Sequence, residues 1–202
     1  MKRWIALLAL VVGAGLPAGA SAQNETLFAN SYKLESEKRY DAAAQAIAGL
    51  AEGGNEFARL RLGWLAYLAG KYNDSIAHYN RLLQVNPNSM DGRLGVTLPL
   101  LAQRRWQDAA AQARHVLQLS PWDYTAHIRL MATEEALKQW QVLETHASTV
   151  AAAYPSDATA LVYLARARAW QRNVAGARQA YAQVLERYPT HEEARAFLKA
   201  NS

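Results

Sequence analysis

The chain has 202 residues, of which 51% are hydrophobic and 19% are charged, and it carries a net charge of +5 with no cysteine. The apolar fraction is too high for a disordered chain. The lack of cysteine excludes a disulfide-stapled domain, a cysteine-ligated metal site and a thiol nucleophile. The basic side chains are dispersed rather than gathered on one face, which argues against a nucleic-acid partner.

The N-terminal 22 residues have the pattern of a targeting segment. Lys2 and Arg3 precede the apolar run Trp4–Leu16, and small residues follow it up to Ala22. A basic start, a short apolar centre and an A-x-A ending are typical of a secretory signal peptide, so we predict cleavage before Gln23. The run is shorter than the roughly 20 apolar residues of a membrane-spanning helix. We therefore expect a periplasmic or secreted protein with no stable membrane insertion after cleavage.

From about residue 56 onward the chain repeats itself every 34 residues, and a degenerate first copy at 24–55 is two residues short. Four kinds of position recur at this spacing: a proline, a mostly aromatic residue, a mostly small residue three places after the aromatic one, and a branched aliphatic residue. In that order, the four columns are Pro87, Pro121, Pro155 and Pro189; Tyr72, Trp106, Trp140 and Val174; Ser75, Ala109, Leu143 and Ala177; and Leu82, Val116, Val150 and Val184. Because all four share one register, the period belongs to the whole region.

This spacing resembles the tetratricopeptide repeat (TPR), most clearly in Leu62-Gly63, Gly70, Tyr72, Tyr79 and Pro87. The resemblance implies an all-α fold, an α–α superhelix or TPR solenoid of about five helix–turn–helix repeats with a C-terminal capping helix. We expect the solenoid to span residues 23–202, with repeats at 24–55, 56–89, 90–123, 124–157 and 158–191 and the capping helix at 192–200.

Each repeat is expected to hold two helices separated by a short turn. The proline near the end of a repeat stops the second helix, because it lacks an N–H and disfavours helix in the residue before it. The expected pairs are 24–37 and 40–52, 56–69 and 72–85, 90–103 and 106–119, 124–137 and 140–153, and 158–171 and 174–187. No segment alternates with a period of two, so no sheet is predicted.

The first helix of the third repeat departs from the pattern. Gly92, Gly95 and Pro99 interrupt it, and Thr97 stands where a small residue is expected. A proline inside a helix removes a backbone hydrogen bond and typically costs about 3 kcal/mol. Two interpretations stay open: a kink that reshapes the binding surface, or an irregularity that the stack tolerates.

The residues show no pattern for catalysis, for a cofactor or for a metal. The histidines lack metal-ligand spacing and are expected to be structural and partly exposed; they are His78, His115, His127, His146 and His191. The pairs Glu134-Glu135 and Glu192-Glu193 are expected to be solvated. There is neither a nucleophile elbow nor a phosphate-binding loop. We therefore predict that the protein is not an enzyme and holds no cofactor.

The resemblance further implies that the first helices line a concave groove for a partner. The predicted groove residues are Phe57, Arg61, Trp64, Tyr67, Leu98, Arg129, Tyr163, Arg166 and Trp170. Aromatic rings interleaved with arginines are typical of interface hot spots. A competing interpretation places Trp64 and Tyr67 between packed helices. The Lys/Asn pairs with which some TPR domains clamp a C-terminal carboxylate are absent here.

The predicted function is a non-enzymatic periplasmic scaffold or adaptor. It would hold a protein or peptide partner in its groove during envelope assembly, secretion or export. The envelope role follows from the resemblance and from predicted export, because a fold does not by itself define a function. Two alternatives stay open: a glycan- or polysaccharide-binding accessory protein of an export system, and a self-assembling homo-oligomer.

Overall fold

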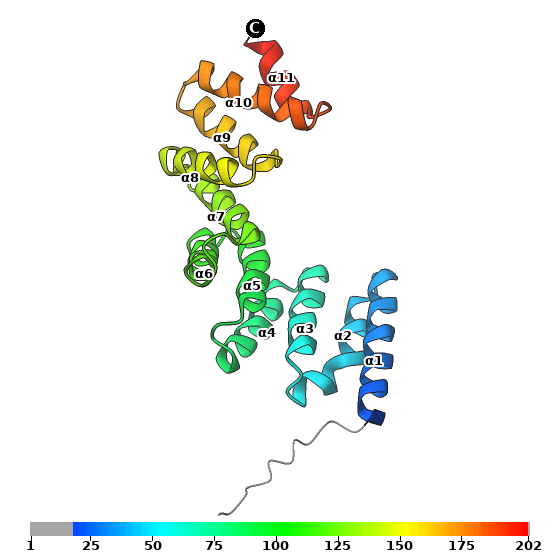
Figure 1. Cartoon of the computed structure of the whole chain (residues 1–202). Coiled ribbons are helices and arrows are strands. Elements are labelled where there is room, and N and C mark those ends of the chain that lie inside the picture. Colours follow the sequence, from blue (N-terminus) through cyan, green and yellow to red (C-terminus); the bar gives the residue numbers. More distant parts are fainter. Residues whose placement is uncertain (1–17, 202) are drawn as a thin grey trace, which may run out of the picture.

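The computed structural model describes residues 18–201, and these form eleven α-helices and no strand (Figure 1). Most of the predicted signal peptide lies outside the described residues. The helices are α1 (Ala18–Ser36), α2 (Tyr40–Glu52), α3 (Glu56–Leu68), α4 (Tyr72–Val85), α5 (Met90–Ala102), α6 (Trp106–Leu119), α7 (Tyr124–Ala136), α8 (Trp140–Ala153), α9 (Thr159–Trp170), α10 (Val174–Arg187) and α11 (Glu192–Ala200). The expected helix pairs are all present, and α1 begins earlier than expected.

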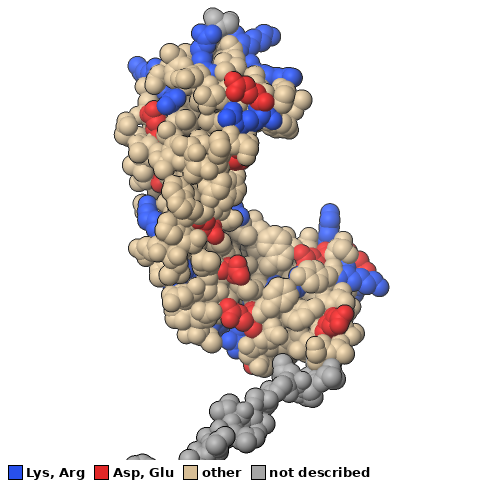
Figure 2. All heavy atoms as spheres, viewed as in Figure 1, with Lys and Arg blue, Asp and Glu red and all other residues tan. Residues whose placement is uncertain are grey.

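Five antiparallel hairpins stack in chain order, and α11 closes the C-terminal end (Figure 1). Each helix packs on the next one along the chain, and from α3 to α9 each first helix also contacts the first helix of the following hairpin. The stack is curved, and Figure 2 shows a wide bay between its two ends. The predicted all-α TPR solenoid is confirmed.

The first helices begin at capping residues that share the 34-residue period. Asn55, Ser89 and Asp123 each accept a hydrogen bond from the backbone N–H three residues later. Asp157 and His191 do the same at the start of α9 and α11. Such side chains satisfy one of the N–H groups that a helix start leaves without a partner. A fifth column of the repeat, which sequence analysis did not use, therefore marks the starts of α3, α5, α7, α9 and α11.

The first helices end in a left-handed residue at the same period. Gly70 has a φ of 73°, and the corresponding Arg104, Lys138 and Arg172 have φ values of 57°, 57° and 63°; Lys38 has 59°. Glycine adopts this conformation freely, whereas other L-residues do so at a cost. The basic side chains stand next to the negative end of the helix dipole, which favours cations there.

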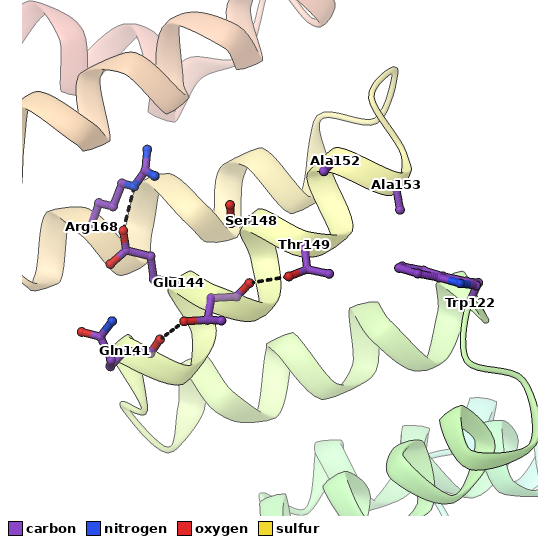
Figure 3. Close-up of a pocket in the computed structure, with 9 residues that line it drawn as sticks. Trp122, Gln141, Glu144, Ser148, Thr149, Ala152, Ala153 and Arg168 are labelled. Atoms are coloured by element: carbon purple, nitrogen blue, oxygen red, sulfur yellow. Dashed lines mark hydrogen bonds and ion pairs between the residues drawn. The ribbon is translucent and has the colours of Figure 1, made fainter.

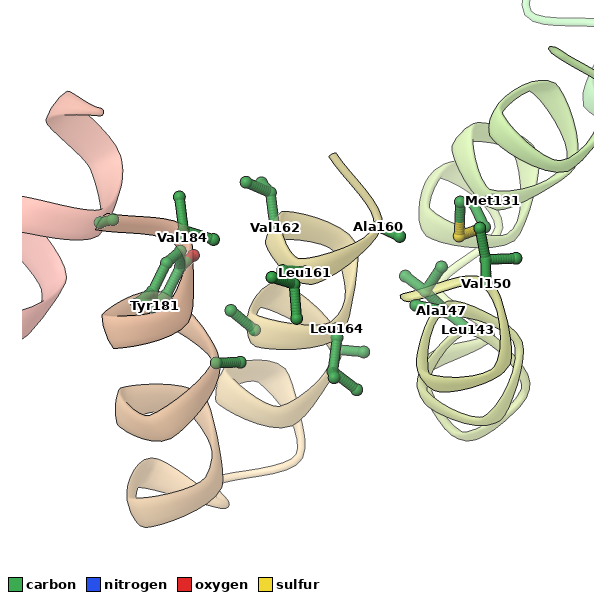
Figure 4. Close-up of a cluster of buried hydrophobic side chains, with 14 residues drawn as sticks. Met131, Leu143, Ala147, Val150, Ala160, Leu161, Val162, Leu164, Tyr181 and Val184 are labelled. Atoms are coloured by element: carbon green, nitrogen blue, oxygen red, sulfur yellow. The ribbon is translucent and has the colours of Figure 1, made fainter. Parts of the chain in front are cut away.

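The core is a series of small clusters between hairpins rather than one central mass. The largest runs from α7 to α11 and includes Met131, Leu143, Val150, Leu164 and Tyr181 (Figure 4). The aliphatic column of the second helices lies at the centre of the stack, because none of its four members is more than 1% exposed. Each hairpin therefore buries its apolar side only against its neighbours.

The glycines of α5 have a packing role. The Tyr79 ring of α4 lies against both Gly63 of α3 and Gly95 of α5. A Cβ atom at Gly63 would come within 2.7 Å of Tyr79 Cζ, and one at Gly95 would overlap the same ring. The helix runs without interruption through Pro99, which is fully buried. The departure of α5 from the repeat pattern is thus partly the space that Tyr79 needs.

Candidate partner-binding groove

The N-terminal wall of the bay is held together by one carboxylate. Glu35 of α1 accepts hydrogen bonds from Arg61 Nη2 at 2.8 Å and from Trp64 Nε1 at 2.7 Å. Arg61 also donates to Ser31 Oγ at 3.0 Å, and its guanidinium lies 3.6 Å from the centroid of the Tyr32 ring. Only 5% of Arg61 is exposed. Its charge is therefore neutralised inside the protein, where it joins α3 to α1.

Aromatic rings cover the same wall. Phe57 is 47% exposed and packs on Phe28, with ring centroids 5.1 Å apart. Tyr67 lies between Trp64 and Tyr72, at centroid distances of 5.7 and 5.8 Å. Trp64 and Tyr67 are half-buried. These two rings therefore both pack between elements and show a face to solvent, and Phe57 is the most accessible of the predicted rings on α3.

The middle of the wall is apolar. Leu98 of α5 is half-buried, as are Leu94 and Leu101 on the same helix. α5 contacts α3 on one side and α7 on the other, so these leucines connect the two ends of the bay. No charged side chain stands among them in the stretch from Leu94 to Leu101. This part of the wall can contribute burial of apolar surface to binding, and no ion pairs.

The C-terminal wall is an ion-pair network around Arg166 of α9. Arg166 Nη2 and Nε lie 2.6 and 2.8 Å from the two carboxylate oxygens of Glu193, and Nη1 lies 3.4 Å from Glu135 Oε1. Tyr181 donates to Glu193 at 2.6 Å. The hydrogen bond with Glu193 raises the pKa of Arg166, and the same bond lowers the pKa of Glu193. Arg166 is thus neutralised by α7 and α11.

Tyr163 and Trp170 complete the predicted residues on α9. Tyr163 is half-buried; burial raises the pKa of its hydroxyl, Glu135 raises it further, and Arg166 and Arg129 oppose them. Trp170 is 66% exposed and stacks flat on Trp140, with centroids 5.2 Å apart and planes inclined by 5°. Because the Arg129 charge lowers the pKa of Tyr163, Arg129 of α7 lies nearby. All nine predicted residues therefore lie on first helices, in α3, α5, α7 and α9.

Inside the fourth hairpin lies a polar chain that sequence analysis missed. His127 Nδ1 is 2.8 Å from His146 Nε2, and His146 Nδ1 is 2.9 Å from Glu134 Oε2. His127 Nε2 lies 3.0 Å from the carbonyl oxygen of Pro121. Glu134 is only 3% exposed. The expectation that Glu134 is solvated was wrong, because the facing helix supplies its partner.

The same two repeat positions hold a polar pair one repeat earlier. Arg93 donates to the Pro87 carbonyl oxygen at 2.6 Å and to Gln112 Oε1 at 2.7 Å. Arg93 and Gln112 stand 34 residues before His127 and His146. A polar residue at the first position therefore ties each of these hairpins to the proline turn before it. This recurrence was the signal that could have predicted the histidine contact.

A separate hollow of about 830 Å³ lies along α8, which is a second helix (Figure 3). Thr145, Ser148 and Thr149 line it, and Trp122, 57% exposed, stands at one end. At the other end Glu144 is paired with Arg168, with Oε1 and Nε 3.0 Å apart. The hollow belongs to a different face from the first-helix wall, and none of the nine predicted residues lines it.

Two further properties bear on the kind of site. Among residues 18–201, no helix is long and apolar enough to cross a lipid bilayer. In the same part of the chain, no three histidine, aspartate or glutamate side chains converge as metal ligands. In the described part of the chain, the wall is a surface of aromatic rings, leucines and paired charges.

Comparisons with known proteins agree with this architecture. Residues 57–89 and 159–191 match the family model for the tetratricopeptide repeat. A TPR protein from Parabacteroides merdae superimposes with a TM-score of 0.77 at 12% identity, covering 89% of this chain and 72% of that one. No curated protein sequence matches the chain.

Two other solved structures superimpose on this chain over nearly their whole length. MamA from Desulfovibrio magneticus RS-1, from residue 41 to its end, gives a TM-score of 0.74 at 14% identity over 84% of this chain and 97% of that one. YrrB, described as a TPR protein with an unusual peptide-binding site, gives 0.72 at 15% identity over 91% and 98%. At these identities the likeness concerns the fold. The chain therefore has the α–α superhelical fold of these TPR structures, and two of its segments match the tetratricopeptide-repeat family model.

Proposed function

We propose that the chain is a non-enzymatic scaffold or adaptor that binds a segment of a partner protein along its first-helix wall. The observation that carries this proposal is the exposure of large rings on that wall: Tyr32 is 50%, Phe57 47% and Trp170 66% exposed. Exposed rings beside apolar surface are typical of interfaces. The likeness to YrrB, whose description names a peptide-binding site, supports the same kind of use.

Site-specific photo-crosslinking tests the proposal. A photoreactive phenylalanine analogue replaces Phe57 or Trp170 on the wall, and Val142 serves as the control because it is 53% exposed on α8. In cells of the native host, we expect one protein to be captured from both wall positions and not from Val142. Capture from all three positions alike, or from none, would contradict a partner-binding site on the first-helix wall.

We also propose export, with cleavage before Gln23, and work in envelope assembly, secretion or export. The basic and apolar start of the chain supports this. The measurement is the mass of the protein recovered from periplasmic and cytoplasmic fractions. We expect a chain that starts at Gln23 in the periplasm and an uncleaved chain when Ala22 is replaced by Arg. Recovery of the intact chain from the cytoplasm alone would refute export.

A second candidate is polysaccharide binding in the α8 hollow. The exposed Trp122 ring can stack on a sugar, and the hydroxyl groups beside it can hydrogen-bond to one (Figure 3). Titration with soluble chito- and alginate oligosaccharides should then change tryptophan fluorescence in the wild type and in Trp170→Ala, and not in Trp122→Ala. Formation of a homo-oligomer is a separate proposal, which sedimentation at several concentrations tests.

A further inference from the structure

The three arginines predicted for the wall differ in what they already bind. Arg61 is paired with Glu35, and Arg166 is paired with Glu193 and Glu135. Arg129, in contrast, forms no hydrogen bond or ion pair with any residue between 18 and 201, and its Nε is buried without an acceptor. A buried donor without a partner is uncommon and costs free energy. Arg129 is therefore the wall arginine that retains an uncompensated charge.

Arg129 is also held in place. Its residue is half-buried and its Nε is covered, so the side chain is packed rather than free to move in solvent. α7, which carries it, lies between α5 and α9. α5 carries the apolar stretch around Leu98, and Tyr163 of α9 is close enough for the Arg129 charge to lower its pKa. A fixed guanidinium loses less conformational entropy on binding than a mobile one.

We propose that the partner segment presents one acidic side chain flanked by apolar residues, and that its carboxylate pairs with Arg129. This inference rests on the proposed function and specifies its partner. Charge complementarity selects the ligand class: one free cation matches one carboxylate. A phosphate group carries about two negative charges and is usually held by several cations. Glu135 is on the same helix as Arg129, and Glu135 and Glu193 together carry one negative charge more than Arg166 compensates, which disfavours a doubly charged group.

The experiment uses a displayed library of random 12-residue peptides, selected on the wild-type protein. Selected sequences are then made as synthetic pairs that differ only by Glu or Gln at the acidic position. Affinities are measured for wild type, for Arg129→Gln and for Arg114→Gln, a matched control because Arg114 is exposed on the second helix α6. Phe57→Ala with Trp170→Ala reports separately on the aromatic wall. Circular dichroism checks that each variant is folded.

We expect the wild type and the Arg114 variant to bind the Glu peptide at least about tenfold more tightly than the Gln peptide. Arg129→Gln should bind both peptides equally. Selection of apolar peptides without an acidic preference, or a preference that survives in Arg129→Gln, overturns this inference and leaves the proposed function intact. Failure of the wild type to select any peptide that depends on Phe57 and Trp170 overturns both.

Discussion

The hairpins α3–α4 and α7–α8 share one repeat frame, but small residues lie between the helices of the first and large ones between the helices of the second. In the α3–α4 hairpin, Gly63 faces Ser75 at the point where the two helices cross. The Ser75 hydroxyl donates a hydrogen bond to the Gly63 carbonyl oxygen at 2.7 Å. The same positions of the second hold Met131 and Leu143, both fully buried. α7 and α8 accordingly contact each other less extensively than α3 and α4. A repeat can therefore keep its length and its turns while the distance between its helices is set by side-chain volume.

The wider hairpin has room for chemistry that the narrow one lacks. The chain from the Pro121 carbonyl through His127 and His146 to Glu134 runs between acceptors at both ends. Its three contacts need three protons, and two neutral imidazole rings carry only two. With both rings neutral, the ring protons therefore supply two of the three contacts. In α3–α4 the position of Glu134 is taken by Ala66, so the acidic end of such a chain is absent.

The largest effect is expected from removing a large side chain where α7 and α8 cross. Leu143→Ala should lower the free energy of unfolding by about 2–5 kcal/mol, because the buried side chain leaves a cavity that the hairpin fills only in part. Val142→Ala, on the exposed side of the same helix, should have almost no effect. Urea unfolding measures both. A loss below about 1 kcal/mol would mean that α7 and α8 close up as α3 and α4 do.

The narrow hairpin should respond to added volume. Gly95→Ala places a methyl group against the Tyr79 ring, which Gly63 confines on its other side, and should destabilise by about 1–3 kcal/mol. Gly49→Ala is the matched control in α2, since a Cβ there meets nothing within 4 Å. It should stabilise by roughly 0.5–1 kcal/mol through helix propensity. Equal urea midpoints for the two variants would be inconsistent with a close fit around Tyr79.

The histidine chain predicts a dependence of stability on pH. Burial lowers the pKa of His127 from 6.5, the contact with His146 lowers it further, and the Pro121 carbonyl, Asp123 and Glu134 oppose this. The unfolded chain therefore binds a proton at this residue more readily than the folded one. The stability that neutral His127 contributes is full above pH 6.5 and is lost as the pH falls through its folded-state pKa.

Replacing this pair with that of the third repeat isolates the effect. The double variant His127→Arg, His146→Gln copies Arg93 and Gln112, which do not titrate near neutrality. Between about pH 7 and pH 5 the wild type should lose more unfolding free energy than the variant. His78, whose pKa burial also lowers, is present in both proteins and cancels in the difference. If the unfolding free energies of the two proteins change with pH in parallel, the His127–His146–Glu134 contacts have no role in the pH dependence.

The smallest effect concerns the turn between the two helices of a hairpin. Gly70 in the narrow hairpin corresponds to Lys138 in the wide one, and both have positive φ. Lys138→Gly should stabilise by about 0.5–1 kcal/mol by removing the cost of a left-handed L-residue, and Gly70→Lys should destabilise by a similar amount. Thermal melts of the two variants compare them directly. The two variants must change the melting temperature in opposite directions, because both positions have the same left-handed backbone conformation.

Much of the fold could be predicted, because a helix and its ends depend on residues close in the chain. Pro87 and its successors mark the ends of the second helices, and Asn55 and its successors mark the starts of the first. The helices that carry the candidate site residues were predictable, and the contacts of those side chains were less so. Placing Arg61 and Arg166 on the wall needed only the repeat frame. Their neutralisation by Glu35 and Glu193 depends on contacts between different hairpins.

By itself, the sequence determined the repeat length, the helix pairs and the side of each helix that faces its neighbours, since these follow from periodicity and local capping. Tertiary structure decided which charged side chains are paired, leaving Arg129 without an ion pair among residues 18–201. It also decided which polar groups meet inside a hairpin, as His127 and Glu134 do with His146. The physical reason is range. Backbone conformation responds to the nearest few residues, whereas an ion pair responds to the distance between helices, and side-chain volume at the crossing sets that distance.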